Sequence, residues 1–243
     1  MKTKLLHCML LAGAVMTAWT ASAVLASSLE EELAEAPPIL RVEEDWELAI
    51  ETPDPNADCP QIVTVFGPTN ANFGTHTLFE LNHGTLPRFQ QGGMQIQVWW
   101  ADWLVGYKSQ FAPTELSTAS EVIRYTTVTN LNPHNNDNSD TASNSYQNTL
   151  DLKIINGQSE TWGTFGDTSD LSIRLYTNRD DLNPYDPYNS IRHSRVTFGA
   201  NRVNRFVRTQ IRFYDKDGLF LTNSDDIYVH RLAIDNSSSG SAD

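Results

Sequence analysis

Short runs in which apolar and polar side chains alternate are the feature of this sequence that most constrains its fold. In residues 94–100 the even-numbered positions are apolar, and Gln95 and Gln97 lie between them. The same period of two recurs in residues 150–154 and 171–175. Because successive side chains of a β-strand point to opposite faces, each run predicts a half-buried strand.

A longer alternating run covers residues 203–213. It predicts a buried face made of Val203, Val207, Ile211 and Phe213, opposite an exposed face made of Arg202, Asn204, Arg208, Gln210 and Arg212. The Asn-Gly pair at 156–157 and the Asp-Gly pair at 217–218 predict hairpin turns.

The fold class follows from these strands and from what is missing between them. After position 26, no segment of 12 or more residues combines helical periodicity with capping residues, so helices that could connect parallel strands are not expected. We therefore predict an all-β fold, an antiparallel β-sandwich (jelly roll), over residues 61–235. Its size and strand pattern resemble laminin G-like and concanavalin A-like jelly rolls. The predicted shared core is Met94, Ile96, Val98, Trp100, Leu152, Ile154, Ile173, Val207 and Ile211.

The first 26 residues have the pattern of a cleavable signal peptide. Lys2 and Lys4 precede an uncharged apolar run, and small residues follow at 21–26. No later segment approaches the ~20 apolar residues that a membrane span needs. We therefore expect a secreted, periplasmic or cell-envelope protein without a transmembrane span. Cys59 is then the single cysteine left, so no internal disulfide can form.

The charge of the chain is acidic and unevenly distributed. It has 17 basic and 30 acidic residues, which argues against nucleic acid as a partner. Residues 27–60 hold eleven acidic residues and one basic residue, a net charge of −10. We predict an acidic leader and Pro-rich linker there, poorly packed apart from Trp46. Residues 236–243 are predicted to be a disordered Ser-rich tail.

Further motifs are the Val-Glu-Glu-Asp-Trp-Glu-Leu leader, the Pro- and Asp-rich stretch 51–61, and the segments at 92–99, 161–166 and 198–203. Together they resemble a family of uncharacterised secreted bacterial proteins. The resemblance implies export and a shared fold, and it assigns no activity to any residue.

The segment Glu43-Glu44-Asp45-Trp46-Glu47 matches the Glu-x-Asp-x-Glu pattern of jelly-roll glycosidases that hydrolyse glucans. On a strand, the first, third and fifth residues would share a face, as a pair of catalytic carboxylates requires. The family places this motif on a central strand, whereas here it lies in the acidic leader. We favour a leader that serves solubility or adds an edge strand, and the alternative is a glycan hydrolase or lyase.

Six arginines fall between positions 192 and 212 with no acidic residue among them. Arg202, Arg208 and Arg212 are predicted to share the outward face of one strand. They could bind an acidic polysaccharide through bidentate contacts, or they could pair with the acidic leader. We favour the internal pairing because it satisfies both charge excesses.

Two further ligand sites are suggested by residue type. Trp99, flanked by Gln95 and Gln97 on an outward face, is suited to sugar binding, unless a loop covers the ring. Asp137, Asn138 and Asp140 offer oxygen ligands for Ca²⁺ in an Asn-rich loop, although a merely solvated loop is favoured. No other cofactor is predicted.

Taken together, these patterns predict a secreted, non-catalytic β-sandwich with a binding or envelope role. The expected partners are an extracellular polysaccharide or an envelope protein.

Overall fold

The computed structural model describes residues 39–51, 61–66, 75–82, 93–100, 102–112, 116, 121–131, 148–177 and 194–231. These residues belong to one compact unit, Ile39–Asp243. The predicted signal peptide, Cys59 and the Ser-rich tail lie outside the described residues.

Eight strands form the larger sheet, in the order β12-β11-β1-β6-β7-β8, with β13 paired to β11 and β9 paired to β7. All of these pairs are antiparallel. The strands are β1 (Arg41–Ile50), β6 (Val122–Leu131), β7 (Asn148–Ser159), β8 (Gly163–Phe165), β9 (Ser172–Thr177), β11 (Val203–Asp215), β12 (Gly218–Asn223) and β13 (Ile227–Arg231).

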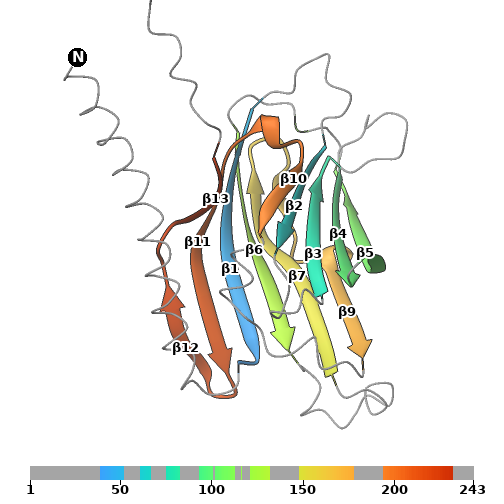
Figure 1. Cartoon of the computed structure of the whole chain (residues 1–243), viewed down its shortest axis with the longest axis vertical. Coiled ribbons are helices and arrows are strands. Elements are labelled where there is room, and N and C mark those ends of the chain that lie inside the picture. Colours follow the sequence, from blue (N-terminus) through green and yellow to red (C-terminus); the bar gives the residue numbers. More distant parts are fainter. Residues whose placement is uncertain are drawn as a thin grey trace, which may run out of the picture. The chain divides into compact units, whose positions relative to one another are not determined.

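Five strands form the second sheet, in the order β10-β2-β3-β4-β5, and these pairs are also antiparallel (Figure 1). The strands are β2 (Ile62–Phe66), β3 (Thr75–Leu81), β4 (Gly93–Trp100), β5 (Trp103–Phe111) and β10 (Arg195–Phe198). Two short 3₁₀ helices, η2 (Ser169–Leu171) and η4 (Ala200–Arg202), precede β9 and β11. The predicted antiparallel β-sandwich is therefore confirmed.

Aromatic side chains join the two sheets in the core. The Trp46 ring of β1 stacks on Phe206, with 4.7 Å between centroids, and lies 5.1 Å from Phe66 of the other sheet. Tyr125 of β6 meets Phe79 of β3 at 5.0 Å. The predicted core residues Met94, Ile96, Val98, Leu152, Ile154, Ile173 and Ile211 are all at most 5 % exposed. Val207 is buried as well, but it lies on the opposite face of the larger sheet and not in this shared core. The side chain of Trp100 is not among those described.

The predicted start of the sandwich at residue 61 is wrong, because β1 lies inside the larger sheet. It pairs with β11 on one side and with β6 on the other, so it is neither a poorly packed leader nor an edge strand. The even-numbered residues Val42, Trp46, Leu48 and Ile50 are fully buried. Glu43, Asp45 and Glu47, which suggested a leader, occupy the opposite face of an ordinary alternating strand, and residues 27–38 and 52–60 lie outside the described residues.

The predicted faces of β11 are wrong between two irregularities in its pairing with β1, and Val203, beyond the second one, is buried as predicted. Asp45 pairs with Gln210, but the next residue, Trp46, pairs with Arg208, so Thr209 is left over. One extra residue reverses the alternation. Arg208 therefore faces the interior beside Trp46, and Val207 lies opposite Glu47 on the other face.

Of the two predicted hairpin turns, the one at 217–218 is confirmed, since it connects β11 to β12. The one at 156–157 is wrong, because these residues lie within β7. Asn156 has a φ of 54° and sits where the pairing with β6 shifts register. The Asn-Gly pair therefore marks a bulge, which needs the same left-handed backbone as a turn.

Candidate ligand-binding face

The outer face of the five-stranded sheet carries a connected row of polar side chains. On β4, Gln95 and Gln97 alternate with core residues and therefore point away from the interior. Glu80 lies directly opposite Gln95 on β3, and Tyr107 lies directly opposite Gln97 on β5. The sheet thus places side chains from three strands next to one another.

Hydrogen bonds connect this row from one side to the other. Trp99 Nε1 donates to Gln97 Oε1 at 2.7 Å, and Gln97 Nε2 donates to Glu80 Oε1 at 2.9 Å and to Gln95 Oε1 at 2.5 Å. Gln95 Nε2 in turn donates to Ser109 Oγ at 2.7 Å. Gln61 Nε2 donates to the second Glu80 oxygen at 3.0 Å. We call these six residues, Gln61, Glu80, Gln95, Gln97, Trp99 and Ser109, the amide ladder.

The two glutamines have a different role from the one predicted. The sequence placed Gln95, Gln97 and Trp99 together on an outward face, and the structure brings them together there. However, Gln95 is 6 % and Gln97 is 9 % exposed, and both are hydrogen-bonded within the ladder. Gln97 holds Trp99 in position through its indole nitrogen, Gln95 bonds Gln97 and Ser109, and neither glutamine presents a free surface.

Sequence reasoning missed Glu80, the acceptor at the centre of the ladder. The signal in the sequence was the alternation in residues 75–81. It places Glu80 on the outward face of a strand, between Phe79 and Leu81. Its neighbours in the ladder come from β4 and from Gln61, and only the strand pairing reveals them.

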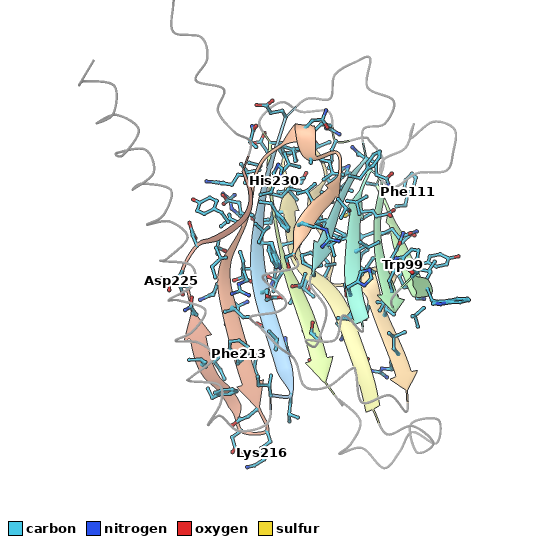
Figure 2. All side chains as sticks on the ribbon, viewed as in Figure 1. Trp99, Phe111, Phe213, Lys216, Asp225 and His230 are labelled. Atoms are coloured by element: carbon cyan, nitrogen blue, oxygen red, sulfur yellow. The ribbon has the colours of Figure 1, made fainter. Side chains whose placement is uncertain are left out.

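Aromatic side chains border the amide ladder on β5. Tyr107 and Phe111 lie opposite Gln97 and Gly93, and their side chains are 61 % and 68 % exposed. Figure 2 shows Trp99 and Phe111 on the side of the molecule where β4 and β5 lie. Exposed rings beside amide groups can stack on the apolar face of a sugar while neighbouring polar groups bond its hydroxyls.

The histidine on this face carries little positive charge at neutral pH. His76 of β3 lies directly opposite Trp99. Burial lowers the pKa of His76, and the charge of Arg195 lowers it further, against a smaller opposite effect of Asp102. Because the neutral imidazole is favoured, His76 adds a polar group to the face without adding a cation.

The three arginines predicted to form a binding face are separated in the structure. Arg202 lies in η4, is 2 % exposed, and donates to the backbone carbonyls of Glu51 and Leu116 at 3.2 Å each. Arg208 is buried in the interior, where it pairs with Glu44 at 2.8 Å. The prediction that all three share an outward face is therefore wrong for Arg202 and Arg208.

Arg212 does lie on the outer face of the larger sheet, where it is paired with two carboxylates. Its Nη1 and Nη2 atoms donate to Asp45 at 2.6 Å and 2.8 Å, and its Nε donates to Glu43 at 2.9 Å. The predicted pairing of the arginine strand with residues 43–47 is confirmed for Arg208 and Arg212.

The Glu-x-Asp-x-Glu motif thus lies on a central strand, with Glu43, Asp45 and Glu47 on one face. Each of the three carboxylates is ion-paired. Arg124 and Arg205 hold Glu47, the former at 2.7 Å. We call the outer-face cluster of Glu43, Asp45, Glu47, Arg41, Arg124, Arg205 and Arg212 the ionic ladder.

The pKa of the first carboxylate of this motif is lowered by its partners. Burial alone would raise the pKa of Glu43, but hydrogen bonds from Arg212 and Tyr214 and the charges of Arg41 and Arg212 outweigh it. The pKa of Glu43 therefore lies below its ordinary value, and the side chain stays ionised.

The predicted calcium ligands Asp137, Asn138 and Asp140 lie outside the described residues. Within the described part of the chain, no group of three or more His, Cys, Asp or Glu side chains is arranged to hold a metal ion. The same part of the chain contains no helix that is long and apolar enough to cross a membrane.

Comparison of the chain with protein-family models, with curated proteins and with solved structures finds no match.

Proposed function

We propose that this protein is a secreted, non-catalytic β-sandwich that binds extracellular polysaccharide at or near the cell envelope. The proposed contact surface is formed by Trp99 and Tyr107 on the outer face of the five-stranded sheet. The observation that carries the proposal is the hydrogen bond from Trp99 Nε1 to Gln97 Oε1, which fixes the indole to the residue that lies opposite the exposed Tyr107.

This arrangement supports sugar binding because it is organised before a ligand arrives. The indole has one donor, and it is already satisfied by the amide ladder. The ring can therefore contribute its apolar face, while Tyr107 adds a second ring with a hydroxyl group. A side chain held in one orientation loses little conformational entropy on binding, which favours affinity.

The charges around the surface favour a neutral polysaccharide over an acidic one. Arg208 and Arg212, two of the arginines expected to hold an anionic polymer, are paired with carboxylates. Glu80 and the neutral form of His76 add no positive charge on the outer face of the five-stranded sheet. Binding should then depend weakly on salt, because no counterions need to be released.

Affinity electrophoresis tests the proposal. The purified protein is run in gels that contain laminarin, xyloglucan or galactomannan, and in gels that contain alginate or heparin, with and without calcium. We expect retardation by at least one neutral polymer, lost in Trp99→Ala and Tyr107→Ala and weakened in Gln97→Leu. Tyr228→Ala removes a ring that is 44 % exposed on β13 and should leave retardation unchanged. No retardation by any neutral polymer, or retardation that survives in Trp99→Ala and Tyr107→Ala, contradicts the proposal.

A glycan hydrolase or lyase is the second candidate, favoured by the position of Glu43, Asp45 and Glu47 on a central strand. A glycosidase needs one carboxyl group that stays protonated to donate to the leaving group. The lowered pKa of Glu43 favours the ionised form of that residue instead, and all three carboxylates are engaged in ion pairs. Release of reducing ends from the same polymers, abolished by Glu43→Gln or Glu47→Gln, would support this candidate over simple binding.

A further inference from the structure

Strand β5 forms one edge of the five-stranded sheet, and among the described strands it pairs with β4 alone (Figure 1). It is nine residues long, and seven of these are exposed. An edge strand presents unpaired backbone N–H and C=O groups that can accept a further strand. The length and exposure of β5 make it such a template.

Proteins usually protect a long edge strand with charges, proline or a covering segment. Within β5, Lys108 is the single charged residue, there is no proline, and one bulge at Val105 interrupts the pairing with β4. Instead, five large apolar or aromatic side chains are exposed: Trp103 72 %, Leu104 45 %, Val105 49 %, Tyr107 61 % and Phe111 68 %. At the opposite edge, β10 has four residues and begins with Arg195. The contrast between the two edges indicates that β5 is the edge suited to pairing with a further strand.

We propose that β5 pairs antiparallel with β5 of a second copy of this chain, so that the two five-stranded sheets become one continuous sheet. Complete overlap of the two nine-residue strands is centred on Tyr107. It brings the Trp103 end of one strand against the Phe111 end of the other and places Lys108 near Gly106 of the second copy. A register centred on Lys108 would instead set two lysines directly opposite each other, which is unfavourable.

The exposed area is of the size that a stable dimer needs. An aromatic side chain has about 150–250 Å² of surface, so three that are 61–72 % exposed present about 300–500 Å² per copy. Two copies present about 600–1,000 Å², and Leu104, Val105 and the strand backbone add to this. Specific interfaces bury about 1,200 Å² or more in total, which the two edges together can supply.

This inference rests on the strand edge and not on the amide ladder, and Tyr107 is the one residue that it shares with the proposed sugar-binding surface. If both hold, the two Trp99–Tyr107 surfaces lie on one face of the same sheet. A long polymer could then contact both surfaces at once, with a gain in overall affinity.

The mass of the protein in solution is the first test. Sedimentation equilibrium or light scattering should give twice the mass of one chain. The double variant Val105→Lys/Phe111→Lys should be monomeric, because a dimer would hold four added lysines at its interface. Its circular dichroism spectrum should be unchanged, because both positions are exposed. The matched control Phe198→Lys/Leu219→Lys changes side chains that are 47 % and 54 % exposed elsewhere and should remain dimeric. A monomeric unmodified protein, or a double β5 variant that stays dimeric, overturns the proposal.

A cysteine at the proposed symmetry axis tests the register. Opposite residues in an antiparallel pair have Cα atoms ~4.5–5.5 Å apart, a separation that a disulfide can bridge. In a chain with Cys8→Ser and Cys59→Ser, Tyr107→Cys should form a disulfide-linked dimer in air, and Tyr228→Cys should not. Linkage at equal rates in both variants, or in neither, contradicts pairing centred on Tyr107.

Discussion

Arg208 and Glu44 form an ion pair inside the sandwich, with Nη1 of the arginine 2.8 Å from Oε1 of the glutamate and both side chains at most 5 % exposed. The pair results from the irregularity at Thr209, which turns Arg208 toward the interior next to Trp46. Breaking a buried ion pair leaves an uncompensated charge, whereas replacing both partners with apolar residues is often neutral.

Arg208→Met should therefore lower the free energy of unfolding by about 3–5 kcal/mol, because the Glu44 carboxylate would remain buried without its partner. The double variant Glu44→Leu/Arg208→Met should recover most of this loss. Urea denaturation of the two single variants and the double variant measures the coupling. Equal losses in Arg208→Met and in the double variant would show that the arginine stabilises the protein through packing alone.

Acid should destabilise the protein through Glu43. Its folded-state pKa lies below the ordinary value of 4.5, so ionised Glu43 contributes stability above that pH. This contribution is lost as the pH falls through the folded-state pKa. Arg212→Gln removes the main hydrogen bond that lowers this pKa and should flatten the fall in stability below pH ~4.5. Lys216→Gln, which breaks an exposed pair with Asp217, should keep the slope of the unmodified protein.

Gly199 and Gly163 both have a φ of 69°, but their surroundings differ. A Cβ at Gly199 would lie 2.4 Å from the backbone oxygen of Gln61, whereas a Cβ at Gly163 meets nothing within 4 Å. Gly163→Ala should cost only the ~1–2 kcal/mol of a left-handed alanine. Gly199→Ala adds a backbone clash and should cost roughly 1–3 kcal/mol more. Thermal unfolding of both variants compares them, and equal losses would mean that β2 moves away freely.

Deleting residues 27–50 should abolish folding instead of uncovering a basic surface. The deletion removes β1, the strand that separates β6 from β11, together with the stacked Trp46. A deletion that ends at residue 38 leaves every described strand in place and should fold. Far-ultraviolet circular dichroism and cooperative unfolding distinguish the two chains. A folded chain without residues 27–50 would contradict the central position of β1.

Much of the sandwich could be predicted because alternation is a local property. The runs around Met94, Leu152 and Ile173 have a period of two, and each is a strand with those residues buried. β1 alternates just as regularly, but its acidic residues suggested a solvated segment. The arginines that neutralise them lie on β6 and β11, far away in the sequence, so the net charge of the segment was misleading.

The candidate site could be predicted only in part for the same reason. Alternation placed Gln95, Gln97 and Trp99 on one face, and this holds. The burial of the two glutamines depends on Glu80 and Ser109, which β3 and β5 bring alongside. The face of Arg208 depends on one extra residue in β11, and no local pattern marks that irregularity.

The central position of β1 also determines when this sheet can form during synthesis. Glu44 and its partner Arg208 are 164 positions apart in the sequence, and the strands that carry them are neighbours. A ribosome therefore releases β1 long before β11 exists, and one edge of β1 has no native partner until then. Such non-local pairing slows folding and keeps the nascent chain unfolded for longer.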